Sequence, residues 1–284
     1  MTENEDPAAL AALRRPLSRQ EGPPSSPRFL FLEGPCDSDC VFCRRKSGPA
    51  TPWAIARRRL DQRVSGGRIC LVGDELLAHP EILRIAGLCR ELGFEAVEVM
   101  TSGLRFADPK FARDLASAGV SALSLPIHSG SREAHDWIVG RRDSHALAMR
   151  AVENALDLGL EVFLHANLLR RNLKTMGEWE ERAAGGLRLA FAILPLRPKT
   201  SRLPYQELAV SIEEVRRAGL RRLAGFPLCA GGRGAVVSES LRAYLRAQAL
   251  SKPPLCSGCR LRAGCPGIFP EQLELFGRGD LRPA

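Results

Sequence analysis

Three cysteines stand where their spacing could support chemistry. Cys36, Cys40 and Cys43 follow the apolar run 29–32 in the pattern CxxxCxxC, and the aromatic Phe42 precedes the last of them. Three thiolates can hold three irons of a [4Fe–4S] cluster and leave the fourth iron without a protein ligand. A structural zinc or iron–sulfur site takes four ligands from the protein. The pattern therefore predicts a cluster with one iron open to a small molecule.

A second group of cysteines lies near the end of the chain. Cys256, Cys259 and Cys265 occur in CSGCRLRAGCPG, and Cys229 precedes them in FPLCAGG. Four thiolates in one compact segment indicate a metal site, and zinc would satisfy the same count as an iron–sulfur cluster. The remaining Cys70 and Cys89 are isolated in apolar segments, and we expect them to be ordinary core thiols.

Length and composition limit the possible classes of protein. The chain has 284 residues, 45% hydrophobic content and a net charge of +9. This length allows one large α/β domain with an appendage, or two small domains. No run approaches the roughly 20 apolar residues of a membrane helix, and the N-terminal stretch lacks the apolar centre of a signal peptide. We expect a cytoplasmic protein that does not contact a membrane, in which disulfides are not the role of the nine cysteines.

The positive charge leaves a nucleic-acid partner open without favouring it. The basic residues are scattered over separate predicted elements, and aromatic residues are few. Such scattering is typical of solvated helix faces, whereas nucleic-acid modules gather their basic residues and aromatics on one face.

Apolar runs alternate with helix-period segments six times between residues 29 and 195. This alternation predicts an α/β fold with parallel strands joined by right-handed crossovers. We divide the chain into a proline-rich tail (1–27), predicted to be disordered, a barrel-like domain (28–200) and a C-terminal extension (201–284) with helices in 211–223 and 238–250. Helix boundaries are predicted from first-turn prolines (Pro80, Pro109), terminal glycines (Gly93, Gly119, Gly159) and N-caps (Asp108, Ser144).

The CxxxCxxC pattern with its aromatic residue resembles the signature of the radical S-adenosylmethionine (SAM) superfamily. The resemblance implies an open partial (βα)6 TIM-like barrel and a cluster whose free iron chelates the amino and carboxylate groups of SAM. It further implies an enzyme in which an electron from the reduced cluster cleaves SAM to methionine and a 5′-deoxyadenosyl radical. That radical would abstract a hydrogen from the substrate.

The superfamily resemblance extends to two turns that follow predicted strands. Gly73, Asp74 and Glu75 resemble a Gly-Gly-Glu motif that receives the SAM amino group, although Asp replaces the second Gly. An ordinary strand-to-helix turn would also explain them. Thr101, Ser102 and Gly103 resemble a Thr-Asn-Gly turn whose hydroxyls face the cofactor, and a polar strand end is the alternative.

Further candidates lie on the fourth and fifth predicted strands. Ser124 occupies a place where members of the superfamily present a polar group to SAM. His165 shares one strand face with Asn167 and could reach SAM or substrate, or it could be a hydrogen-bonded filler. The stretch 124–172, with His135 and Asp136, is similar to that of peptide-maturing members such as His-Xaa-Ser system maturases. A helix-start hydrogen-bond pair is the simpler interpretation of His135 and Asp136.

The C-terminal cysteines resemble the auxiliary-cluster extensions of the SPASM and twitch type, which implies a second [4Fe–4S] cluster, with zinc as the alternative. The first functional hypothesis is oxidative modification or crosslinking of a ribosomally made peptide, with an electron donor such as flavodoxin or ferredoxin. Modification of a small molecule or an RNA is the second. A non-catalytic iron–sulfur or zinc protein on a degenerate scaffold is the third, because Gly73-Asp74-Glu75 departs from the motif. No catalytic side chain is assigned.

Overall fold

The computed structural model describes residues 28–43, 48–63, 65–185, 190–197, 202–231, 235–246 and 250–284. The predicted tail 1–27 lies outside these residues. Six parallel strands form one open sheet in the order of the sequence. They are β1 (Arg28–Leu32), β2 (Arg68–Gly73), β3 (Ala96–Met100), β4 (Val120–Pro126), β5 (Glu161–Leu168) and β6 (Ala190–Pro195).

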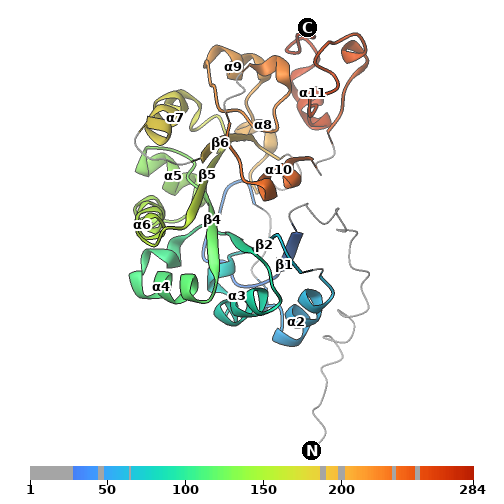
Figure 1. The fold of residues 1–284 in the computed structure, drawn as a ribbon. Helices are drawn as coiled ribbons and strands as arrows, with labels where there is room; N and C mark the ends of the chain where they lie inside the picture. The colour runs from blue at the N-terminus through green and yellow to red at the C-terminus, as the bar shows by residue number, and fades with distance from the viewer. Residues whose placement is uncertain are drawn as a thin grey trace, which may run out of the picture.

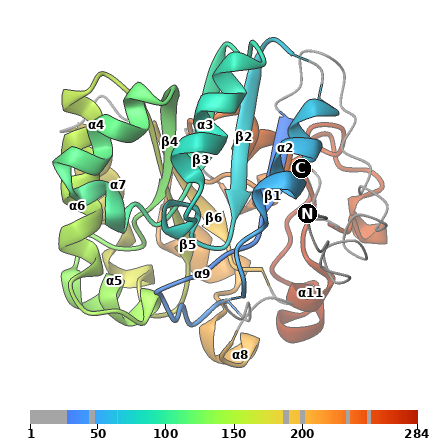
Figure 2. The ribbon, with the colours of Figure 1, turned by 90° about the horizontal axis from the view of Figure 1, so that it is seen from below.

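Helices connect consecutive strands and cover the outer face of the sheet (Figures 1 and 2). They are α2 (Trp53–Asp61), η1 (Leu76–Ala78), α3 (Ile82–Glu91), η2 (Leu104–Ala107), α4 (Pro109–Ser117), α5 (Arg132–Val139), α6 (Ser144–Asp157), η3 (Leu173–Thr175) and α7 (Met176–Gly185). The predicted α/β partial (βα)6 barrel is confirmed.

Alternation along each strand builds the core. Leu30, Leu71, Val99 and Leu164 are buried in one continuous cluster with the apolar sides of the helices. Every second residue points to the other, concave face instead. On that face β5 carries Phe163 and the polar residues His165 and Asn167, all three half-buried. The concave face is therefore less apolar than the outer one, as expected for a face that works on a ligand.

Helix boundaries follow the predicted punctuation in part. Asp108 caps α4, Pro109 is its first residue, and the three predicted terminal glycines have positive φ. Two predictions are wrong. Pro80 precedes α3, whose N-cap position is Glu81, and Ser144 is not an N-cap because Asp143 holds that position without a side-chain bond. The carboxylate of Asp136 supplies the cap instead, accepting from the Ser144 hydroxyl and the His145 amide at 2.8 Å.

The C-terminal region packs around the open side of the sheet with α8 (Tyr205–Leu208), α9 (Ile212–Arg217), η5 (Leu228–Ala230), α10 (Glu239–Arg246), η6 (Pro254–Cys256) and α11 (Pro270–Phe276). The helix predicted through residue 223 ends early because Gly219 adopts φ +64°. Beyond it, Leu223 bridges to Ile193 and extends the sheet past β6. The Gln272 amide donates to the Val210 carbonyl at 2.6 Å and accepts from the Tyr205 hydroxyl, which fixes α11 on α8.

Helix α10 lies on the concave face of the sheet (Figure 1), where Leu241 packs with Ala192 and Leu194 of β6 and with Met100 of β3. The extension is thus anchored inside the barrel as well as beside it. Among the described residues, no helix has both the length and the apolar character needed to cross a membrane.

Candidate functional site

The loop that carries Cys36, Cys40 and Cys43 leaves the carboxyl end of β1 and is closed at its base. The Glu33 amide donates to the Thr51 hydroxyl at 2.8 Å, and the Thr51 amide donates to the Glu33 carbonyl at 2.9 Å. The buried His79 accepts the Glu81 amide at Nδ1, so its Nε2 carries the proton that bonds the Thr51 carbonyl at 3.0 Å. These bonds hold the thiols over the edge where active sites of parallel α/β folds form.

The far side of the loop is held by the end of α5. Asp39 and Val41 donate their amides to the carbonyls of Val139 and Ile138 at 3.1 and 3.0 Å. Gly140 ends α5 with φ +67°, and a Cβ there would stand 2.3 Å from the Asp39 carbonyl oxygen. Only glycine therefore allows this close approach of helix and loop.

Phe42 lies edge-on to the ring of His128, with centroids 5.0 Å apart, and packs with the buried cluster around Val41 and Ile138. His128 in turn accepts the Asn167 amide at 3.2 Å. Phe42 therefore packs beneath the cysteine loop.

The three thiols are half-buried and influence one another. The Cys43 amide bonds the Cys40 carbonyl at 3.0 Å, which folds the loop into a turn. Burial, with the neighbouring Cys43 and Cys36, raises the pKa of Cys40 to about 12, and burial also raises the pKa of Cys36. The thiols of Cys40 and Cys36 are therefore protonated at neutral pH without metal, so binding iron must displace their protons.

Glu75 is the centre of the turn after β2. Its carboxylate accepts from the Leu77 amide at 3.0 Å, from the Ser102 amide at 2.8 Å, and from the hydroxyls of Thr101 and Ser102. Four donors satisfy the acceptor positions of one carboxylate. The structure thus brings Glu75 and Ser102 together, and shows Glu75 capping η1 and anchoring the Thr101–Gly103 turn.

Gly73 and Asp74 join this turn to the cysteine loop. A Cβ on Gly73 would stand 1.8 Å from the carbonyl oxygen of Leu32, so the two strand ends approach too closely for any side chain. The Asp74 carboxylate accepts from the Gly34 amide at 3.2 Å, two residues before Cys36. The predicted motif is therefore adjacent to the thiols, and both acidic residues bond to the loops around it.

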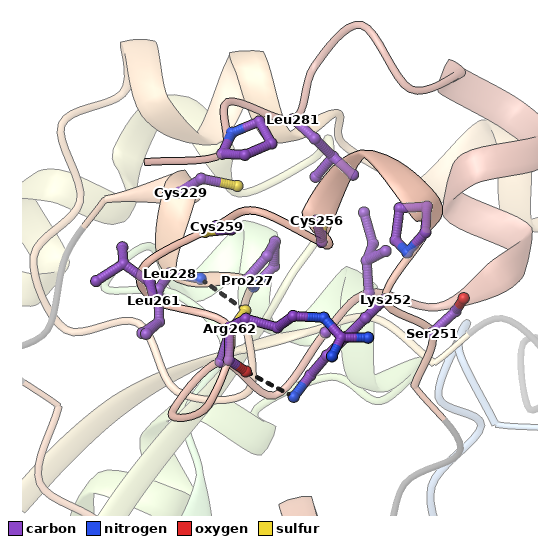
Figure 3. Close-up of a pocket in the computed structure, with 15 residues that line it drawn as sticks. Pro227, Leu228, Cys229, Ser251, Lys252, Cys256, Cys259, Leu261, Arg262 and Leu281 are labelled. Atoms are coloured by element: carbon purple, nitrogen blue, oxygen red, sulfur yellow. Dashed lines mark hydrogen bonds between the residues drawn. The ribbon is translucent and has the colours of Figure 1, made fainter.

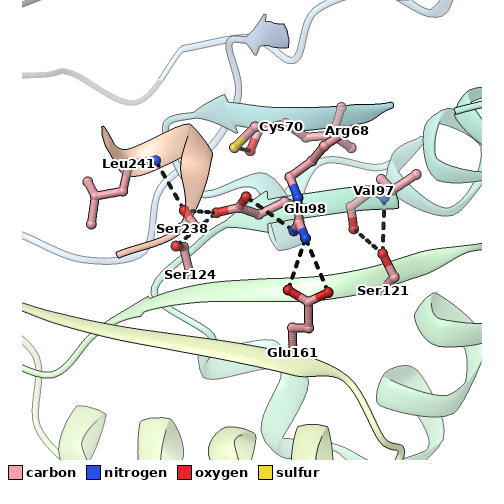
Figure 4. A network of polar contacts seen from close by, with 10 residues as sticks. Arg68, Cys70, Val97, Glu98, Ser121, Ser124, Glu161, Ser238 and Leu241 are labelled. Atoms are coloured by element: carbon pink, nitrogen blue, oxygen red, sulfur yellow. Dashed lines mark hydrogen bonds and ion pairs between the residues drawn. The ribbon is translucent and has the colours of Figure 1, made fainter. Parts of the chain in front are cut away.

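Ser124 belongs to a different network, deep on the concave face (Figure 4). Its hydroxyl donates to Oε1 of Glu98 at 3.0 Å, and the Ser238 hydroxyl donates to the same oxygen at 2.7 Å. Oε2 of Glu98 lies 3.5 Å from Nη1 of Arg68, which also pairs with Glu161 at 2.9 Å. Ser124 and Glu98 are fully buried. Ser124 meets the turn anchored by Glu75 through its backbone, because its carbonyl accepts from the Thr101 amide at 3.2 Å, while its hydroxyl faces Glu98.

His165 lies on the concave face of β5, opposite Pro126 of β4. Its Nδ1 is buried without a hydrogen-bond partner in the described residues, and burial lowers its pKa to about 4. It is therefore a neutral imidazole at physiological pH, able to donate or accept one bond to a ligand. His135 accepts the His128 backbone amide at 3.1 Å. His135 and Asp136 both lie within α5 and do not form a pair at its start, although Asp136 caps the start of α6.

The C-terminal thiols line one pocket outside the barrel (Figure 3). Cys229, Cys256, Cys259 and Cys265 all contribute to its wall, with Leu281 and Pro283. The Leu228 amide donates to the Cys265 sulfur, and the Ala284 amide donates to the Cys259 sulfur, each at 3.4 Å. Four sulfurs facing one space fit the ligand count of a closed [4Fe–4S] cluster or of zinc. Within the described residues, no three His, Cys, Asp or Glu side chains lie close enough together to hold a single metal ion.

Comparison with known families decides the relationship of the chain. The model of the radical SAM superfamily matches residues 35–182, just over half of the chain, from the residue before Cys36 to the end of the fifth βα unit. The chain belongs to the radical SAM superfamily. Membership makes it a radical SAM enzyme and implies a SAM-binding [4Fe–4S] cluster and SAM as its cofactors. The side chains of Cys36, Cys40 and Cys43 are thiols, the type of donor that such a cluster takes.

Curated relatives match about half of the chain. A probable GTP 3′,8-cyclase of Aeropyrum pernix is 30% identical over 149 residues, which are 48% of this chain and 41% of that protein. A probable GTP 3′,8-cyclase of Methanopyrus kandleri is 26% identical over 164 residues, 54% of this chain and 52% of that protein. The chain spans about half the length of the curated relatives it matches.

Solved radical SAM structures share the fold. SuiB of Streptococcus suis bound to its precursor peptide SuiA has a TM-score of 0.54 at 15% identity, covering 69% of this chain and 45% of SuiB. The enzyme anSMEcpe with bound SAM and a peptide has a TM-score of 0.53 at 15% identity, covering 68% of this chain and 57% of that chain. At this identity the likeness concerns the fold alone.

Several residues of the site escaped sequence reasoning. Glu98 interrupts the apolar strand AVEVM. A charged residue in the middle of a buried strand indicates a polar partner in the core, so this signal was present in the sequence. His79 gave no signal, because the Thr51 carbonyl that it binds is 28 residues away in sequence. The same holds for the two amides that donate to thiol sulfurs. The sequence singled out Asp136, but not as the cap of the following helix.

Proposed function

We propose that this radical SAM enzyme oxidatively modifies or crosslinks a ribosomally made peptide and holds a second [4Fe–4S] cluster at Cys229, Cys256, Cys259 and Cys265. The single observation that carries the proposal is the pocket lined by these four thiols. Oxidising a substrate leaves an electron to be removed, and a closed cluster beside the barrel would accept it. Zinc, which has no redox chemistry, would not.

The chain's own residues would divide the work at the first site. Cys36, Cys40 and Cys43 would hold the cluster that, when reduced, cleaves SAM to a 5′-deoxyadenosyl radical. We assign the turn Gly73-Asp74-Glu75, together with Ser102, to SAM binding. Asp74 accepts the Gly34 amide next to the cysteine loop, and Glu75 accepts the Ser102 amide. His165 would offer its unpartnered ring nitrogen to SAM or substrate. Ser124 would act through the concave-face network.

The peptide substrate is supported by the fold shared with SuiB, whose structure contains its precursor peptide. A nucleotide or another small molecule is the second candidate, favoured by the GTP 3′,8-cyclases among the curated relatives. Flavodoxin or ferredoxin would supply the reducing electron. The two substrate classes are separated by measuring which of them, a precursor peptide or GTP, binds the reconstituted protein.

The proposal is tested with anaerobically reconstituted, reduced protein. We expect about eight irons per chain, two clusters of four, and release of 5′-deoxyadenosine from SAM. Replacing Cys36, Cys40 and Cys43 by Ala should halve the iron and abolish SAM cleavage, whereas Cys89→Ala, at a buried thiol of α3, should change neither. Retained cleavage in the triple variant would falsify the assignment of the first site.

A further inference from the structure

The four-thiol pocket has a rim of one charge. Between Glu239 and Glu271 the sequence contains no acidic residue, but it contains five basic ones: Arg242, Arg246, Lys252, Arg260 and Arg262. Three of these, Lys252, Arg260 and Arg262, lie in 251–268, the longest of the three segments that line the pocket, and we call them the basic rim. A segment that carries only basic charges contributes a positive potential on its side of the pocket.

The geometry leaves the charges of the rim available. Lys252 and Arg262 line the pocket, and the ammonium of Lys252 donates to the Arg262 carbonyl at 2.9 Å (Figure 3). Arg260 is exposed and does not line the pocket. No acidic side chain in the described part of the chain pairs with any of the three. By contrast, nearby Arg282 is paired with Glu213 at 3.3 Å.

The thiols lie just beneath this surface. Gly258 and Arg260, on either side of Cys259, are both exposed, and Cys259 itself is half-buried. Redox centres exchange electrons only when they come close together. A redox group held by these thiols would therefore be reached from outside the molecule over the basic rim, and not through the barrel.

We propose that the basic rim is a docking surface for an acidic one-electron carrier protein of the flavodoxin or ferredoxin type. The oxidised carrier would take from the C-terminal site the electron that substrate oxidation leaves there, and would itself be reduced. The inference rests on the proposed function, because it takes the four-thiol pocket as a redox site. A positive rim around a shallow redox site is complementary to the acidic surface of such a carrier, and complementary charges speed encounter and fix orientation.

The test uses the full reconstituted chain and a purified acidic flavodoxin, with binding measured by calorimetry at low and high salt. Arg260→Glu with Arg262→Glu should weaken binding by about tenfold at low salt and flatten its salt dependence. The matched control is Arg57→Glu with Arg58→Glu on α2, which makes the same change in net charge at two exposed residues far from the pocket in sequence. It should bind within about twofold of the unmodified protein.

Equal weakening in the rim variant and the control would overturn the inference, since total charge would then explain the binding. An affinity that is the same at low and high salt would also overturn the inference. Because Arg262 lines the pocket, the double variant could lose iron, and in that case the test uses Arg260→Glu alone. Iron content separates the two proposals: a chain with zinc or no metal at these cysteines contradicts the proposed function, whereas a fully loaded chain with unchanged docking in Arg260→Glu contradicts only this inference.

Discussion

The Ser238 hydroxyl donates to the buried carboxylate of Glu98 across 2.7 Å. The bond joins two parts of the chain that are 140 residues apart, the C-terminal extension and the third strand of the barrel. Ser238 also accepts the Leu241 amide at 3.1 Å and so caps α10. One hydroxyl thus both starts the helix that occupies the concave face and ties it to the sheet.

Ser238→Ala should therefore lower the free energy of unfolding by about 2 kcal/mol. It removes a hydrogen bond to a charged group, typically about 1.5–3 kcal/mol, together with a helix cap. Denaturant unfolding measures the loss, and Ser257→Ala, at an exposed position, is the control. Hydrogen exchange should show faster opening of residues 235–246. An unchanged unfolding midpoint would mean that α10 is held by its apolar contacts alone.

Glu75→Ala should reduce both stability and SAM binding. Four donors lose their acceptor, which costs about 1–3 kcal/mol, and the turn assigned to SAM loses its anchor. We expect SAM affinity to fall by roughly tenfold to a hundredfold with unchanged iron content, because no metal ligand is removed. Calorimetry with SAM and a thermal melt provide the two readouts. A lowered melting temperature with normal SAM affinity would make Gly73-Asp74-Glu75 a purely structural turn.

Cys256→Ala with Cys259→Ala should lower the iron content from about eight to about four per chain. The remaining cluster at Cys36, Cys40 and Cys43 should still cleave SAM, because the two sites use separate ligands. Iron analysis and electron paramagnetic resonance measure the result. One zinc per chain in the unmodified protein would make the C-terminal pocket a structural clip whose metal contributes directly to folding.

Ala284→Pro should make the reduction potential of the C-terminal cluster more negative. Proline lacks the amide proton that donates to the Cys259 sulfur, and such bonds stabilise the more negative, reduced state. Ala284→Gly retains that amide and should leave the potential in place. A potentiometric titration followed by electron paramagnetic resonance compares them. Equal potentials in the two variants would show that this amide does not tune the site.

The metal-free protein should lose stability as the pH falls from about 6.5 to 4. Burial lowers the pKa of His165 and of His135 to about 4, whereas both titrate near 6.5 when unfolded. The unfolded state therefore binds more protons within this window. Stability falls by at most about 1.4 kcal/mol per pH unit for each such group.

His165→Phe should make this loss smaller, since it removes one titrating group without breaking a hydrogen bond at Nδ1. Urea unfolding at several pH values gives the slopes. Parallel slopes for the variant and the unmodified protein would remove His165 from this account.

The sequence by itself determined the order of the strands, the type of fold and the two groups of cysteines. Alternating apolar runs and helix-period segments are local patterns, and parallel strands with right-handed crossovers leave few arrangements. The spacing of Cys36, Cys40 and Cys43 is local as well, so a short stretch of sequence was sufficient to indicate the cluster and the superfamily.

Only the tertiary structure decided which polar groups meet. Glu98 accepts hydrogen bonds from both Ser124 and Ser238. The Asp136 carboxylate caps α6 in place of Ser144, and Glu75 accepts hydrogen bonds from the turn after β3. These partners come from separate βα units or from backbone atoms, which carry no sequence signal. A buried polar group must find a partner wherever the fold places one, so these bonds become visible only when the strands and helices are assembled.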